Sequence, residues 1–179
     1  NLPTEITELQ VFGIEMCYIP QGAFYIGSGG TEASHFYTYG GNSPYQITSD
    51  ATIIIDTTIG NLYYEPEVDA GDGLGPIPAT FPKGYNAFYS MKYEITQEQY
   101  ANFLNTLDIT QQAERFPNQF NTFRHSIKLV NGVYGCDANN NEILNEATDG
   151  QTIACNCLSW ADGTAYADWS GLRPMTELE

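Results

Sequence analysis

Residues 156–179 read NCLSWADGTAYADWSGLRPMTELE, and this stretch decides the fold. Ser159 is followed three residues later by Asp162, which is the spacing of a helix capping box. Three apolar side chains then fall on one face at helical spacing: Ala165, Tyr166 and Trp169. Gly171 provides a typical helix end. The stretch therefore predicts a helix that begins after Ser159 and ends before Gly171.

The same stretch ends on a second helix start. Thr176 and Glu179 have capping-box spacing, and no apolar periodic run follows them. Three residues of helix cannot offset the cost of nucleation, since the nucleation constant is on the order of 0.001. We therefore expect the domain to continue beyond Glu179 and to be truncated here at its C-terminal end.

A second capping box stands in the middle of the chain, at Thr96 and Gln99. The positions that follow place one apolar face at helical spacing: Tyr100, Phe103, Leu104 and Leu107. Alternation and β-rich composition predict short strands at four places: two within 11–28 around the turn Pro20-Gln21-Gly22, one at 51–56, one at 87–95 and one at 151–160. Glycine, proline and polar residues predict long loops at 29–41, 65–86 and 137–150, while 108–135 shows no clear period.

Three separated stretches resemble one protein family. EMCYIPQGAFYIGS (15–28), FYSMKYEITQEQYANFL (88–104) and the 156–179 stretch are similar, in the same order, to motifs of the formylglycine-generating enzyme (sulfatase-modifying factor) family. The resemblance implies a loop-rich α+β fold of C-type-lectin-like type. It covers about 11–179 as the N-terminal portion of such a domain. The polar residues 1–10 are expected to form a linker from an upstream domain.

The resemblance also bears on activity. Family enzymes oxidise a sulfatase cysteine to formylglycine with a copper-binding cysteine pair, which lies beyond the Pro-Thr-Glu motif and so matches none of the cysteines of this chain. Copper is expected only where that later half is present and catalytic. Other family members are non-catalytic components of bacterial surface assemblies. We therefore expect a chain without enzymatic activity.

The charges are strongly unbalanced. There are 22 acidic and 6 basic residues, a net charge of −16. Nucleic acids and anionic membranes bind proteins through Lys and Arg, so neither is an expected partner. No run of about 18 apolar residues is present to insert into a membrane. The composition favours a secreted or cell-surface protein.

One loop offers oxygens at alternating positions. The candidate calcium ligands are Asp137, Asn139, Asn141, Asn145 and Asp149. Against the EF-hand pattern, Glu142 stands where Gly is expected and Thr148 where Glu is expected. The alternative is a solvated Asn- and Asp-rich turn. A second acidic loop carries Glu65, Glu67, Asp69 and Asp72.

The remaining reactive residues are few. Cys17, Cys136, Cys155 and Cys157 are disulfide candidates with three pairings open, and buried free thiols are the alternative. His35 and His125 are expected in loops or at the surface. No phosphate-binding glycine loop, nucleophile elbow or zinc-protease motif occurs.

Three functions follow from these observations. The first is a non-catalytic structural or interaction module on a bacterial surface or outside the cell, with a protein partner or a second copy as its ligand. The second is a fragment of an active formylglycine-generating oxidase. The third is a calcium-dependent module that binds carbohydrate, since tyrosines cluster in the loops HFYTYGG and NLYYEP and can stack on a glycan.

Overall fold

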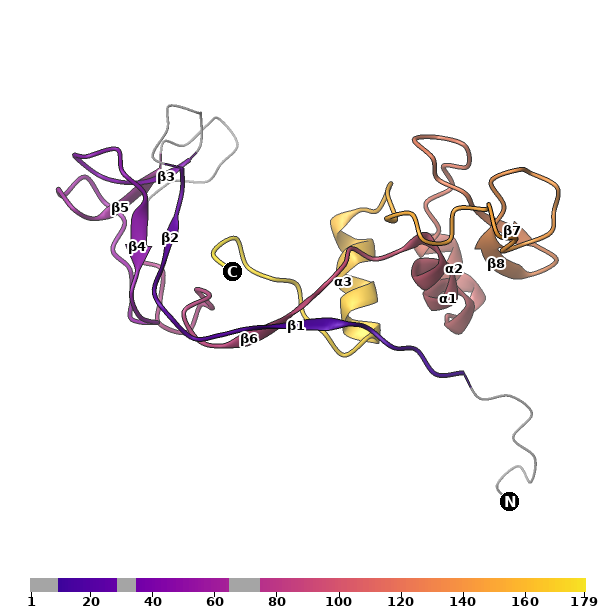
Figure 1. The fold of residues 1–179 in the computed structure, drawn as a ribbon, viewed down its shortest axis with the longest axis horizontal. Helices are drawn as coiled ribbons and strands as arrows, with labels where there is room; N and C mark the ends of the chain where they lie inside the picture. Colours follow the sequence, from indigo (N-terminus) through magenta and orange to yellow (C-terminus); the bar gives the residue numbers. More distant parts are fainter. Residues whose placement is uncertain (1–9, 29–34, 65–74) are drawn as a thin grey trace, which may run out of the picture. The chain divides into compact units, whose positions relative to one another are not determined.

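The computed structural model describes residues 10–28, 35–64 and 75–179. The chain divides into two compact units. Unit 1 runs to Met91 and also includes Met175–Glu179, whereas unit 2 is Lys92–Pro174. Unit 1 contains six strands: β1 (Met16–Ile19), β2 (Phe24–Ile26), β3 (Phe36–Thr38), β4 (Tyr45–Ile47), β5 (Leu62–Tyr64) and β6 (Phe88–Met91) (Figure 1). Unit 2 contains α1 (Gln97–Thr106), α2 (Ile109–Arg115), β7 (Ile127–Val130), β8 (Val133–Cys136) and α3 (Trp160–Trp169).

The strands of unit 1 form three small antiparallel sheets. β1 pairs with β6, β2 with β4, and β3 with β5. The two strands predicted within 11–28 are confirmed as β1 and β2, but each finds its partner far along the chain. The turn at Pro20-Gln21-Gly22 therefore joins two different sheets.

Several predictions for unit 1 were wrong. Residues 51–56 form no strand, because Ile53 and Ile55 make only isolated bridges, to Ile77 and Leu62. The predicted loop 29–41 contains β3. The strand predicted over 87–95 ends at Met91, and Tyr89 and Tyr93 are 65% and 62% exposed.

The core of unit 1 includes the end of the chain. Leu178 is 4% exposed and packs with Ile47, Ile53 and Leu62. Thr176 Oγ1 donates to the carbonyl of Pro82 at 2.9 Å, and its backbone N–H donates to Glu179 Oε2 at 3.0 Å. The capping-box spacing at 176–179 thus forms an ordered turn that is docked on the chain's own N-terminal unit.

Unit 2 is built around its predicted helices. Both capping boxes are present in full, from Thr96 to Gln99 in α1 and from Ser159 to Asp162 in α3. The buried cluster contains eight side chains: Tyr100, Ala101, Phe103, Leu104, Ile127, Tyr134, Cys136 and Tyr166. Aromatic rings meet edge-to-face across it, as for Phe103 and Tyr166, whose centroids lie 5.7 Å apart.

The 108–135 segment is more regular than its sequence indicated. Asp108 caps α2 through a third capping box with Gln111. β7 and β8 form a hairpin whose turn residues, Asn131 and Gly132, both have left-handed backbone, with φ of 51° and 83°. In contrast, the strand predicted at 151–160 is absent, and only Ala154 makes a bridge, to Thr96.

Candidate functional site

The loop that follows β8 collects the predicted calcium ligands. Asp137 opens it and has no exposed surface. Its Oδ1 accepts the backbone N–H of Asn141 at 3.0 Å, and its Oδ2 accepts the backbone N–H of Glu142 at 3.0 Å. The carboxylate therefore holds the N–H groups of residues four and five positions further along the chain, which folds the loop back on itself.

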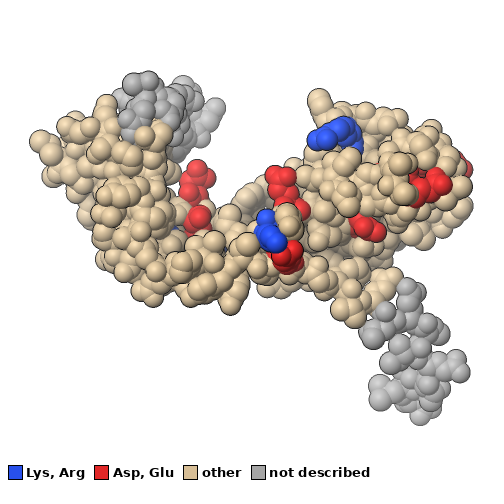
Figure 2. Space-filling view, viewed as in Figure 1, with Lys and Arg blue, Asp and Glu red and all other residues tan. Residues whose placement is uncertain are grey.

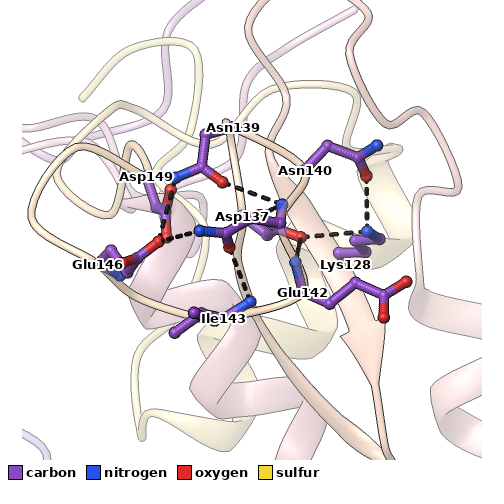
Figure 3. Close-up of polar contacts among 9 residues, drawn as sticks. Lys128, Asp137, Asn139, Asn140, Glu142, Ile143, Glu146 and Asp149 are labelled. Carbon is purple, nitrogen blue, oxygen red and sulfur yellow. Dashed lines mark hydrogen bonds and ion pairs between the residues drawn. The ribbon is translucent and has the colours of Figure 1, made fainter.

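A lysine on the neighbouring strand β7 forms an ion pair with the Asp137 carboxylate. Lys128 Nζ lies 3.1 Å from Asp137 Oδ2 and 2.6 Å from Asn140 Oδ1 (Figure 3). Burial alone would raise the pKa of the Asp137 carboxyl, but the hydrogen bond from Lys128 and the two backbone N–H groups outweigh burial and lower that pKa below its ordinary value of 3.8. Asp137 is therefore an anion in the folded chain at neutral pH.

Two asparagines of the loop form Asx turns, in which the side-chain oxygen accepts the backbone N–H two residues on. Asn139 Oδ1 accepts the N–H of Asn141, and Asn141 Oδ1 accepts the N–H of Ile143, at 3.0 and 2.9 Å. Their amide groups donate to one oxygen of Glu146, at 3.1 and 2.6 Å. Asn139 and Asn141 thus form two successive side-chain turns whose amide groups converge on the Glu146 carboxylate.

The last two candidate ligands lie where the loop returns to the core. Asn145 Oδ1 accepts the N–H of Cys136 at 2.8 Å. Asp149 has no exposed surface, and its Oδ2 accepts the N–H of Glu146 at 2.8 Å, while its Oδ1 is buried with no hydrogen-bond donor. The structure therefore brings the five predicted residues into one loop, and calcium binding stays a prediction. In residues 10–28, 35–64 and 75–179, no group of three or more His, Cys, Asp or Glu side chains is placed to hold a metal ion.

Sequence reasoning missed Lys128, Asn140 and Glu146. A signal for Lys128 was available, because Asn131-Gly132 is a typical two-residue hairpin turn. That turn fixes the register, in which Lys128 pairs with Gly135, two residues before Asp137. The second acidic loop, with Glu65, Glu67, Asp69 and Asp72, lies outside the described residues.

The two histidines lie in different units. His35 stacks against Tyr37 in unit 1, with ring centroids 5.2 Å apart. His125 in unit 2 lies in a loop, as predicted, but is only 1% exposed, and its Nδ1 lies 3.2 Å from Asn156 Oδ1. Burial lowers the pKa of His125 below its ordinary value of 6.5, more than the Asn156 hydrogen bond raises it.

The four cysteines are free thiols in this structure. Cys136 belongs to the core of unit 2, and Cys155 packs against that core. Burial raises the pKa of Cys136 to about 11, and burial followed by the neighbouring thiols Cys136 and Cys157 raises that of Cys155 to about 12. Thiols with such pKa values stay protonated near neutral pH. The disulfide pairings stay predictions.

The described part of the chain contains no helix that is both long and apolar enough to cross a membrane. No curated protein and no solved structure matches the chain. The family described as sulfatase-modifying factor enzyme 1-like domain matches residues 10–179. This match extends over both units and over all three stretches that carry the resemblance. The chain therefore belongs to the formylglycine-generating enzyme-like, or sulfatase-modifying factor enzyme 1-like, domain family.

Proposed function

We propose that this chain is a non-catalytic structural or interaction module that works on the cell surface or outside the cell. The observation that carries the proposal is a set of large apolar side chains that ordered elements hold in solvent. Trp160, the first residue of α3, is 76% exposed, although the capping box of Ser159 and Asp162 fixes its backbone. Tryptophan is one of the residue types enriched at the energetic centres of protein interfaces.

Unit 1 presents a comparable feature. Tyr18 and Tyr89 lie opposite each other on β1 and β6, with ring centroids 5.3 Å apart. They are 57% and 65% exposed. Rings that are ordered in the free chain lose little conformational entropy on binding, which favours a contact surface.

Two of the thiols have a structural place. Cys136 belongs to the core of unit 2, and Cys155 packs against it. The acidic side chains in Figure 2 are scattered over the face in view, as is typical of a surface kept soluble by charge, and the net charge of −16 favours a partner with basic groups.

An oxidation assay tests the absence of catalysis. The chain is incubated with Cu⁺, oxygen, a thiol reductant and a sulfatase-derived peptide that contains the target cysteine. Mass spectrometry should find the peptide cysteine unchanged. An aldehyde that forms in proportion to the amount of chain would overturn the non-catalytic assignment and favour the oxidase.

Light scattering over a range of protein concentrations tests the contact surface. We expect the apparent mass of the wild-type chain to rise with concentration, or with an added basic partner domain, and Trp160→Ser to abolish that rise. Ile109→Ser is the matched control, because Ile109 is 83% exposed at the start of α2. Identical behaviour of wild type and Trp160→Ser would contradict a role for this side chain.

A further inference from the structure

Two lysines of this chain have their ammonium groups inside loops. Lys83 in unit 1 has no exposed surface. Its Nζ donates to three backbone carbonyls, those of Asp50 at 3.2 Å, Pro78 at 2.7 Å and Phe81 at 3.0 Å. Buried charges of this kind persist only where hydrogen bonds replace the lost water. The group fills the place at which loop carbonyls converge, much as a bound cation would.

Lys128 does the same in unit 2 with stronger acceptors. Its Nζ donates to the Asp137 carboxylate and to Asn140 Oδ1, and it lies 5.4 Å from the centroid of the Phe120 ring. The lysine side chain is 23% exposed, whereas that of Asp137 has no exposed surface. The positive charge therefore screens a carboxylate that water does not reach.

We infer that the Lys128 ammonium is the resident cation of the 137–146 loop, where it takes the role that a divalent metal ion has in a metal-binding loop. Hard cations such as Ca²⁺ require six to eight oxygens turned toward one point. Here the oxygens of Asp137, Asn139 and Asn141 are turned toward backbone N–H groups. The lysine supplies the missing positive charge, and the loop closes without added metal.

The position of Lys128 in the hairpin makes this arrangement local. β7 and β8 hold Lys128 opposite Gly135, and Asp137 follows two residues later. The backbone N–H of Asp137 donates to the Ser126 carbonyl at 2.9 Å, so the backbone hydrogen bonds of the hairpin continue to the start of the loop. The hairpin thus places the cation at the start of the loop.

Thermal unfolding of the whole chain with and without Ca²⁺ tests the inference first. The unfolding midpoint of the wild-type chain should be the same in millimolar CaCl₂ and in excess EDTA. A rise in the midpoint that saturates with CaCl₂ and is reversed by EDTA would overturn the inference, because it would show that a metal ion and not the ammonium completes the loop.

A double-mutant cycle supplies the second test. Lys128→Met should lower the unfolding midpoint in the wild-type background and lower it much less in an Asp137→Asn background, because the neutral amide no longer needs a cation. Lys92→Met removes the same charge outside the loop and should show no such dependence on Asp137. Equal losses for Lys128→Met in both backgrounds would contradict the assignment. If Lys128→Met does not fold, Lys128→Arg keeps the charge and should retain the wild-type insensitivity to Ca²⁺; calcium dependence there would equally overturn the inference.

Discussion

At the residue scale, asparagines form several of the tight turns of unit 2. Asn131, Asn140 and Asn145 have φ of 51°, 60° and 63°, in the left-handed region that asparagine tolerates better than most residues. Glu142 is also left-handed, at φ 67°, without that preference. Its backbone N–H donates to Asp137 Oδ2, which offsets part of the strain. The side-chain hydrogen bonds and the left-handed backbone conformations therefore favour the same turns in this loop.

Buried His125 predicts a pH dependence. The unfolded chain takes up a proton on this ring as the pH falls through 6.5, whereas the folded chain does so only at lower pH, because burial lowers the pKa. Between the folded pKa and 6.5 the unfolded state binds more protons, so the free energy of unfolding should fall as the pH is lowered through this window. Urea unfolding of unit 2, followed at a series of pH values, measures the slope.

The other histidine provides the control for this experiment. His125→Gln should remove the slope near 6.5, while His35→Gln leaves the buried ring in place and should retain it. A slope that survives His125→Gln would assign the pH dependence to another group.

At the element scale, the capping boxes explain why the helices form where they do. Thr96, Asp108 and Ser159 each accept an N–H from the first helical turn, and a side chain three residues later closes each box. Such caps stabilise a helix by about 1 kcal/mol each. The fourth capping-box spacing, at 176–179, forms a turn instead of a helix. Leu178, the buried side chain of this turn, packs in the core of unit 1.

That side chain gives the second prediction. Leu178→Ala should lower the free energy of unfolding of unit 1 by about 2–5 kcal/mol, because it removes buried methyl groups from contact with Ile47, Ile53 and Leu62. Met175→Ala, at a position 53% exposed, should change it by much less. Equal effects in urea titrations of the two variants would show that the tail is not part of the core.

At the scale of the whole molecule, the described residues form two cores with no side chain in common. One contains Ile47, Ile53, Leu62 and Leu178, and the other surrounds Phe103 and Tyr166. Effects of mutations at sites without shared partners usually add to within about 0.5 kcal/mol. We therefore expect core mutations in the two units to have additive effects on stability.

Hydrogen exchange resolved by residue tests this expectation. Leu178→Ala should speed amide exchange in β2, β4 and β5, and Phe103→Ala should do so in α1 and α3. The double variant should show the sum of both effects. Faster exchange in α1 caused by Leu178→Ala alone would reveal coupling that the separate cores do not predict.

The sequence predicted the parts of the fold that depend on local chemistry. The helices after Thr96 and Ser159 follow from caps and periodicity within one short window, and the motifs within 156–179 indicate the family. The loop at 137–150 was also visible, because alternating Asn and Asp residues favour turns. The exposure of Tyr89 in β6 was not visible, since alternation alone does not tell which face of a strand is buried.

The sequence by itself determined the local structures and the family. Each helix, turn and motif depends on residues a few positions apart, whose contacts hardly depend on the rest of the chain. Only the tertiary structure decided the long-range partners. β1 pairs with β6 instead of its neighbour β2, and Leu178 enters a core formed more than 100 residues earlier in the chain. These contacts depend on which side chains are buried together, and a short window of sequence does not carry that information.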